Sequence, residues 1–400
     1  MKKLKRNEGL LIFGRWTSKV GDIVFDYVNN VVLVQAFTNS SWVLALYQSS
    51  QTIINVLFNI VGGAIADSGK RKRILIITDL LSALVCFVTS FFIGSNLLAA
   101  AVITANALLA LIFSFSSPTF KSIVREMVEK DRISFYNSIS NGGKELIAMI
   151  GPVIGLGLMN IVGARGALLI NAATFLISAL SECFLVNLEQ EKKEEAAKGK
   201  KNILGDIKEG FKYLWQEKTI FYLLVISAFV NFFLAGYNLL IPYTDVIYQG
   251  KFQGFYSKVM VAEAIGGIVG SFINSKLPAK FTKKYSVLLL FLGATGIALV
   301  LAPIASLTGN LIVCLVPFLL FGTMLTMFNI NFMSYVQIHV DENYLGRVFS
   351  VIFTVAVMFM PLGSFVFSFL HITDSINGFG IMGLGIILLA VLSQNLIKGT

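Results

Sequence analysis

GGAIADSGKRKRILIITD, residues 62–79, joins two apolar runs through four consecutive cations, Lys70 to Arg73. Four cations on a short turn between two apolar helices cannot be buried, and a cytoplasmic turn between two membrane spans accommodates them. Asp67 follows Gly63 by one helical turn, and a glycine there lets a neighbouring helix approach closely. The stretch therefore predicts a membrane hairpin with Asp67 at the membrane–water boundary.

The composition is that of an integral membrane protein. Of the 400 residues, 56% are hydrophobic and only 14% are charged. Apolar runs of about 20 residues recur from end to end. The net charge of +10 is scattered over short turns, which favours cytoplasmic loops and disfavours nucleic-acid binding. The first apolar run carries four charges and no convincing cleavage site, so we expect a span there and not a signal peptide.

Twelve apolar segments are long enough to cross a hydrocarbon layer of roughly 30 Å. They cover residues 10–37, 42–66, 74–94, 98–117, 136–160, 164–187, 220–246, 254–275, 285–305, 310–336, 345–370 and 378–397. The sequence therefore predicts an all-α integral membrane fold.

One long hydrophilic segment, residues 189–219, separates two groups of six spans. It begins as a charged linker and continues with apolar residues at helical spacing, which predicts an amphipathic helix at the membrane surface. We therefore expect an N-terminal half over 1–188 and a C-terminal half over 220–400. Most cations fall in the loops of one side, so the positive-inside rule places both termini in the cytoplasm of a multi-pass cell-membrane protein.

Residues suited to catalysis do not cluster in the sequence. The two histidines lie far apart, and the three cysteines sit within apolar runs. No phosphate-binding glycine loop or nucleophile–base arrangement is recognisable. We expect neither an enzyme nor a protein that needs a metal or another cofactor.

The basic turn resembles the loop between helices 2 and 3 of the major facilitator superfamily, Gly-x-x-x-Asp-(Arg/Lys)-x-Gly-(Arg/Lys)-(Arg/Lys). The matching residues are Gly63, Asp67, Arg71 and Lys72. Two departures are visible, because Ser68 replaces a cation and Gly69 comes one residue early. The spacing from Asp67 to Asp79 is similar to that of the macrolide-efflux and enterobactin-exporter branch. The resemblance implies twelve helices in two six-helix halves and transport by alternating access.

The resemblance also implies a conformational switch. Asp67 would face the positive N-terminal end of the helix over 345–370 and hold the cytoplasmic side closed. The residues assigned to the switch are Gly63, Asp67, Arg71, Lys72, Asp79 and Arg347. In the second half, Gly270-x-x-x-Asn274 repeats the pattern without the acid, which indicates a parallel internal repeat.

The segment 10–37 carries a stripe of polar residues at helical spacing. Arg15, Lys19, Asp22 and Asp26 lie on one face, which should point to a protein interior or a watery path, because charges are expensive in lipid. Asp26 has no cation in the adjacent turn of its own helix, and such a carboxylate can take up and release a proton. Asp26 is the first candidate for proton coupling and Asp22 the second. The alternative is a static ion-pair network.

Glu263 is the other deep acid, and small residues surround it. A glycine-rich surface follows it, and the segment 136–160 offers a partner surface that resembles the Gly-Pro-x-x-Gly element of drug:proton antiporters. The residues of this expected helix-packing hinge are Gly143, Gly151, Pro152, Gly155, Gly266, Gly267 and Gly270. The resemblance packs the helices over 136–160 and 254–275 together. Lys144 is a possible partner of Glu263 or of an anionic substrate, although simple helix packing with charges at the cytoplasmic end explains it better.

Aromatic and amide side chains on several spans suit a cavity for a cationic amphipathic substrate. The candidates to line it are Lys19, Tyr27, Asn231, Phe232, Tyr237, Phe328 and Asn329. The leading function is secondary active export of apolar or cationic small molecules, of the multidrug-resistance type, with the proton gradient as energy source. Alternatives are export or flipping of a siderophore, lysophospholipid or peptide, or a non-transporting membrane receptor or assembly partner. We expect a monomer in the lipid bilayer.

Overall fold

The computed structural model describes residues 2–66, 71–186, 215, 217–278, 284–341 and 344–398. Within these residues the chain is helical and contains no strand. It divides into two compact units. Unit 1 comprises residues 1–38 and 46–194, and unit 2 comprises residues 39–45 and 195–400.

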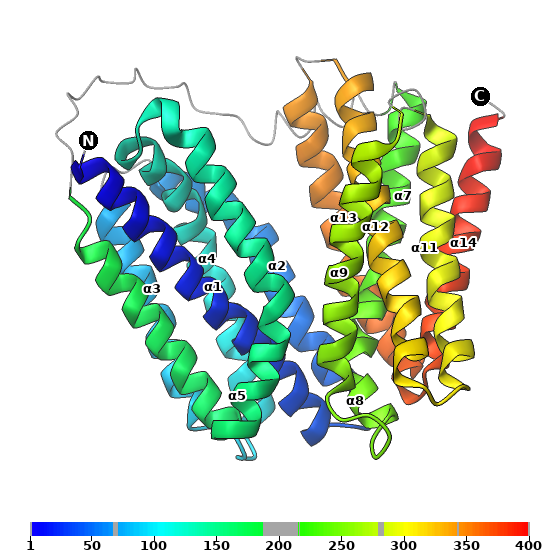
Figure 1. The fold of residues 1–400 in the computed structure, drawn as a ribbon, viewed down its shortest axis with the longest axis horizontal. Coiled ribbons are helices and arrows are strands. Elements are labelled where there is room, and N and C mark those ends of the chain that lie inside the picture. Colours follow the sequence, from blue (N-terminus) through cyan, green and yellow to red (C-terminus); the bar gives the residue numbers. More distant parts are fainter. Residues whose placement is uncertain are drawn as a thin grey trace. The chain divides into compact units, whose positions relative to one another are not determined.

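Figure 1 shows the described helices in two groups, which precede and follow residues 187–214. The first group is α1 (Lys2–Ala36), α2 (Ser41–Ala66), α3 (Arg71–Ser90), α4 (Leu98–Met127) and α5 (Ile133–Cys183). The second group is α7 (Lys218–Leu240), α8 (Thr244–Ile247), α9 (Phe255–Lys276), α11 (Tyr285–Ser306), α12 (Leu311–His339), α13 (Leu345–Phe369) and α14 (Asn377–Lys398). Three short 3-10 helices lie between them: η1 (Lys130–Arg132), η2 (Ile241–Tyr243) and η3 (Ile372–Asp374).

Nine helical stretches of the described chain are long and apolar enough to cross a membrane. One of them, Phe135–Cys183, contains two helices that meet at Gly163, whose φ of 71° lies in the left-handed region. Glycine adopts this conformation without the steric cost that a Cβ would bring. The bend falls between the expected spans 136–160 and 164–187. The stretches that qualify do not include α1 and α2, so the count of twelve spans stays a prediction.

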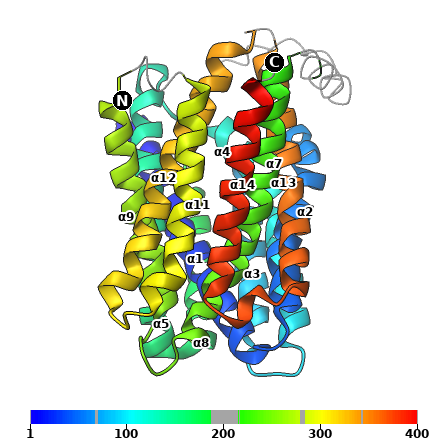
Figure 2. The same cartoon turned by 90° about the vertical axis from the view of Figure 1, so that its right-hand side faces the viewer.

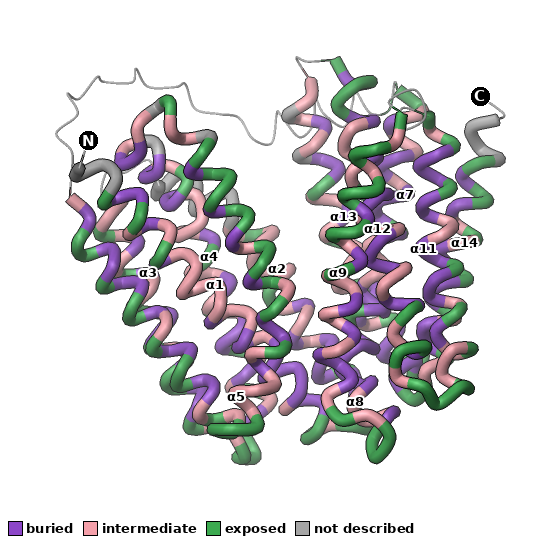
Figure 3. Tube along the Cα trace, viewed as in Figure 1, coloured by how far each residue is buried: buried purple, intermediate pink, exposed green. Residues whose placement is uncertain are grey.

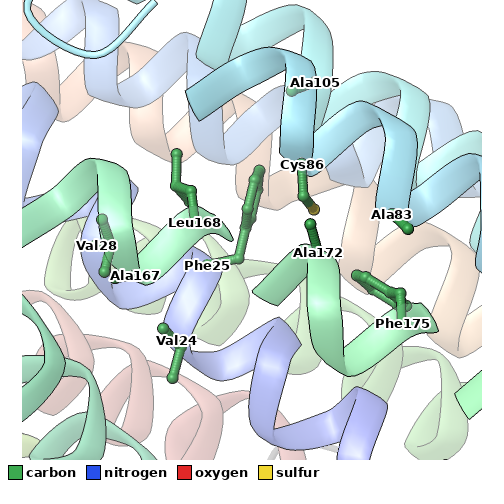
Figure 4. Close-up of a cluster of buried hydrophobic side chains, with 10 residues drawn as sticks. All are labelled: Val24, Phe25, Val28, Ala83, Cys86, Ala105, Ala167, Leu168, Ala172 and Phe175. Carbon is green, nitrogen blue, oxygen red and sulfur yellow. The ribbon is translucent and has the colours of Figure 1, made fainter. Parts of the chain in front are cut away.

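In unit 1, α1 packs along α5, and α3 packs against both α4 and α5. A buried apolar cluster joins these helices (Figure 4), with Phe25 of α1, Cys86 of α3, Ala105 of α4 and Leu168 of α5 among its members. This cluster lies beside the polar stripe of α1, so the stripe is held on a rigid support.

In unit 2, α7 packs against α13 and α14, α9 against α12, and α11 against α12 and α14 (Figure 2). Glycines allow the closest approaches. A Cβ on Gly266 or Gly270 of α9 would collide with the backbone of α12, and one on Gly363 of α13 would collide with the carbonyl of Phe232. These three glycines are therefore required for packing within the unit.

Buried and exposed residues alternate along the helices at helical spacing (Figure 3), and many exposed residues are large and apolar, as a lipid-facing surface requires. The helix α4 is longer than the span expected over 98–117. It continues past Pro118 and ends at Met127. The amphipathic helix expected over 203–215 lies outside the described residues, apart from Trp215.

Candidate functional site

Asp26 of α1 lies inside unit 1 and is held by a second helix. The hydroxyl of Tyr47 on α2 donates a hydrogen bond of 3.2 Å to Asp26 Oδ1. One turn further along α1, Asn30 Nδ2 donates to the Asp26 carbonyl at 2.7 Å, and Gln48 Nε2 donates to Asn30 Oδ1 at 3.2 Å. The amide of Asn106 on α4 donates to the Tyr47 carbonyl at 2.7 Å. Three helices therefore position this carboxylate.

Lys19 is the cation that acts on both acids of the stripe. It is the leading electrostatic partner of Asp22 and also attracts Asp26, two turns away on the same helix. Asp22 and Asp26 repel each other. Arg15 also attracts Asp22, but it attracts Asp79 and Glu182 as well, so these four acids outnumber the two cations Arg15 and Lys19.

The glycines of α5 accommodate α1. A Cβ on Gly151 would collide with Ile23, and one on Gly155 would lie 2.8 Å from the Tyr27 ring. A Cβ on Gly143 would collide with the ring of Trp16. Pro152 is buried beside Gly151. The contact of these residues with α1 was not expected from the sequence. Their expected packing against the helix over 254–275 stays a prediction.

A second charged cluster lies on the same face of α1, nearer its N-terminus. Asp79 of α3 hydrogen-bonds Ser178 of α5 and attracts Arg15 of α1, and Glu182 of α5 interacts with both Asp79 and Arg15. Glu182 is only 6% exposed. Sequence analysis placed Asp79 in the switch and missed Glu182, although a single acid in the apolar run that ends α5 was a visible signal.

The basic turn at residues 70–73 is partly described. Arg71 forms an ion pair with Glu126 of α4. Lys72 Nζ donates to the carbonyls of Cys183 at 2.8 Å and Leu185 at 2.7 Å, at the C-terminal end of α5. A cation there offsets the negative end of the helix dipole.

The remaining switch residues are placed only in part. Asp67 lies outside the described residues, and Gly63 lies in α2. The guanidinium of Arg347, in the first turn of α13, lies 5.7 Å from the centroid of the Tyr344 ring. The predicted contact of Asp67 therefore stays a prediction.

Sequence reasoning also missed a polar connection near the start of α1. Arg132 of η1 donates to both oxygens of Glu8, with distances of 2.7–3.1 Å, and Asn7 exchanges two hydrogen bonds with the backbone of Val186. The bonds to Glu8 raise the pKa of the Arg132 guanidinium above its usual value, so it stays charged. This connection fixes the N-terminal turns of α1 against both ends of α5.

Glu263 of α9 is the acid of unit 2, and its partner is aromatic. The hydroxyl of Tyr237 on α7 donates to Glu263 Oε2 at 2.8 Å. The Tyr237 ring lies 4.3 Å from that of Phe321 and 5.6 Å from that of Phe379, measured between centroids. A Cβ on Gly322 of α12 would collide with the Glu263 carbonyl. The acid thus lies in an apolar, tightly packed environment.

The repeat position of the second half is neutral and paired. Asn331 Nδ2 on α12 donates to Asn274 Oδ1 on α9 at 2.7 Å and to the Met327 carbonyl at 2.7 Å. Asn331 is 1% exposed. An amide pair therefore joins α9 and α12 where the first half carries Asp67 in its sequence.

The residues expected to line a cavity differ in exposure and in their contacts. Tyr27 and Phe328 are buried, at 1% and 2% exposure, and Tyr237 is occupied with Glu263. Phe232 packs on Phe233 and Phe367, and Asn231 donates to the Ser227 carbonyl at 2.8 Å. Lys19 is half-buried, and Asn329 is exposed. Their common role around a substrate stays a prediction.

No group of three or more metal-ligating side chains comes together in the part of the chain that is described. The titratable residues that do come together are carboxylates with a nearby cation or phenol. Such groups bind protons or cations and attract cationic ligands.

Comparison with known proteins gives one consistent family. The sequence profile of the Major Facilitator Superfamily matches residues 24–364. The multidrug efflux pump Tap of Mycobacterium tuberculosis H37Rv is 26% identical over 335 residues, which cover 79% of this chain and 75% of that protein. Tap of Mycolicibacterium fortuitum is 22% identical over 373 residues, or 88% and 86% of the two chains.

The fold is shared with solved transporters. The crystal structure of the nucleoside transporter NupG superposes with a TM-score of 0.77 at 14% identity and covers 98% of this chain and 99% of that one. The profile match spans most of the chain, and the relatives are transport proteins. This chain therefore belongs to the Major Facilitator Superfamily and is a multi-pass membrane transporter, not an enzyme.

Proposed function

We propose that this transporter exports cationic or apolar small molecules from the cytoplasm in exchange for protons, and that Asp26 is the acid that couples the two. The observation that carries the proposal is the arrangement around Asp26. Its carboxylate is held by the Tyr47 hydroxyl at 3.2 Å and, like that of Asp22, is attracted by Lys19, while Arg15 also attracts Asp22.

This arrangement suits both a proton and a positively charged substrate. In a medium of low dielectric constant, four carboxylates with two cations carry an uncompensated negative charge, which either ligand reduces. Because both cannot be favoured at the same time, binding one releases the other. Such competition is sufficient for antiport when the site opens alternately to the two sides of the membrane.

The cargo class is supported by the relatives and by the composition of the helices. The Tap proteins are multidrug efflux pumps, and unit 2 supplies many aromatic rings that offer apolar surface. We infer cytoplasmic termini, because the cations lie mainly in the loops of one side, and we propose that the protein acts as a monomer. Alternating access would involve movement of the halves over 1–188 and 220–400, with the basic turn and Arg347 as the cytoplasmic switch.

The test is transport in everted membrane vesicles, with a fluorescent cationic dye as the substrate and an imposed proton gradient. The native protein should accumulate the dye, and a protonophore should abolish accumulation. Asp26→Asn keeps the size of the side chain and removes the negative charge, so it should abolish gradient-driven accumulation while dye efflux down its own gradient persists. Glu145→Gln, an exposed acid of α5, is the matched control and should transport normally.

An Asp26→Asn protein that still accumulates dye with unchanged dependence on pH would exclude Asp26 as the coupling residue. Asp22→Asn would then be the next variant to test. Absence of dye transport by the native protein, with its presence in the vesicles verified, would exclude this cargo class.

A further inference from the structure

Unit 1 contains a second pair of carboxylates that the proposed coupling at Asp26 does not use. Asp79 of α3 and Glu182 of α5 interact with each other, and Arg15 of α1 attracts both. We call these two acids the Asp79–Glu182 pair. Arg15 also attracts Asp22, so the pair shares this cation with the acids near Lys19.

The side chains of the pair and of Arg15 each contact identified neighbours. Glu182 is 6% exposed, and its Oε2 is buried without a hydrogen-bond partner in the described part of the structure. Asp79 hydrogen-bonds Ser178, one turn before Glu182 on α5. The guanidinium of Arg15 lies 4.2 Å above the centre of the Phe120 ring, which fixes its position from the α4 side.

An oxygen that is buried without a donor is costly when it is charged. Close packing also restricts rearrangement, because a Cβ on Gly14 of α1 would lie 2.5 Å from Ser181 Oγ. A proton on one of the two acids would supply the missing hydrogen bond.

Charged groups of α1 and α5 surround the pair. From α1, Arg15 faces the pair, and Asp22 lies further along, where it repels Asp79. From α5, Tyr136 and Lys144 act on Arg15. The α4 side presents the apolar ring of Phe120. Arg15 thus balances one of the two negative charges, and the second requires a proton.

We propose that Asp79 and Glu182 form a second proton-binding site, in which one proton is held between the two carboxylates and Arg15 balances the remaining charge. On binding, a proton passes from water to a carboxylate oxygen and forms an O–H bond. On release, that bond breaks and the proton returns to water. No other bond forms or breaks, and no group is oxidised or reduced.

The site also extends the path of acids along unit 1. Asp22 is repelled by Asp26 on one side and by Asp79 on the other, so the acids form a series that ends at Glu182 near the C-terminus of α5. A proton could pass along such a series between Asp26 and that end of the unit. This relay role rests on the proposed proton antiport, whereas proton binding by the pair does not.

The experiment is infrared difference spectroscopy of the purified full-length protein in lipid nanodiscs, recorded during a pH jump without substrate. Protonated carboxyl groups absorb in a region free of protein amide bands. Asp79→Asn and Glu182→Gln should each remove the same carboxyl band, because both variants abolish one shared proton. Glu145→Gln should leave the spectrum unchanged, and Asp26→Asn should remove a different band.

Loss of different bands in Asp79→Asn and Glu182→Gln would overturn the shared site, and so would spectra identical to that of the native protein. If Glu182→Gln fails to fold, Asp79→Asn and Arg15→Gln carry the test. Removing the Arg15 charge should shift the titration of that band to higher pH, and an unchanged titration would also overturn the proposal. If Asp26→Asn removes no band while the Asp79 and Glu182 variants remove the same one, the coupling proposal fails and the Asp79–Glu182 site stands.

Discussion

Tyr237 of α7 donates a hydrogen bond of 2.8 Å to Glu263 Oε2 of α9, and its ring is packed between Phe321 and Phe379. The rings prevent the phenol from turning away, so the bond is a fixed link between the two helices. It also supplies a donor to an acid whose surroundings are apolar. The relationship resembles that of Tyr47 and Asp26 in unit 1, where a phenol likewise donates to a carboxylate of another helix.

Tyr237→Phe should therefore destabilise the protein. The variant keeps the packed ring and removes the donor, which leaves a half-buried acid without this hydrogen bond at a cost of about 1–3 kcal/mol. Thermal unfolding in detergent should show a lower midpoint. Tyr222→Phe, on the same helix where the ring packs beside Phe221, is the control and should unfold like the native protein. A double variant with Glu263→Gln should lose less than the sum of the single effects, and full additivity would contradict a direct interaction.

The close approach of α1 to α5 gives a second prediction. A Cβ at Gly143 would collide with the Trp16 ring, whereas one at the adjacent Gly142 would meet open space. Gly143→Ala should lower the free energy of unfolding by about 1–3 kcal/mol, because overpacking displaces side chains. Gly142→Ala should be neutral or slightly stabilising, because alanine favours helix more than glycine does.

Tryptophan fluorescence during thermal unfolding measures this difference, since Trp16 lies at the affected contact. The emission of the folded Gly143→Ala protein should also differ from that of the native protein. Equal stabilities of the two alanine variants would show that the Trp16 ring adapts without cost and would contradict the packing argument.

The sequence predicted the helical class and the boundary between the spans 136–160 and 164–187, where the bend at Gly163 falls, because apolar length is a local property. The end of α4 was also open to prediction. Phe120, Ile123, Val124 and Met127 recur at helical spacing and are all buried, so the helix continues past Pro118 at the cost of one hydrogen bond. The expected span over 98–117 did not take this spacing into account.

The partners of the acids could not be predicted in the same way. The stripe on α1 follows from spacing along one helix, but Tyr47 and Glu182 meet it only through the packing of other helices. A sequence read one helix at a time contains no information on which residues of separate helices meet. For the same reason the only partner considered for Glu263 was Lys144, and the hydrogen bond from Tyr237 was missed.

The basic turn gives the last prediction, because its neighbouring cations have different surroundings. Lys72 donates to two carbonyls at the C-terminal end of α5, whereas Arg73 is exposed. Lys72→Gln should remove the favourable charge at that helix end, worth ~0.3–1 kcal/mol, and loosen the last turn of α5. Hydrogen–deuterium exchange should then become faster at residues 183–186. Arg73→Gln removes the same charge from the turn and should leave this exchange unchanged. Faster exchange in both variants would mean that the net charge of the turn, and not the Lys72 contact, stabilises the end of α5.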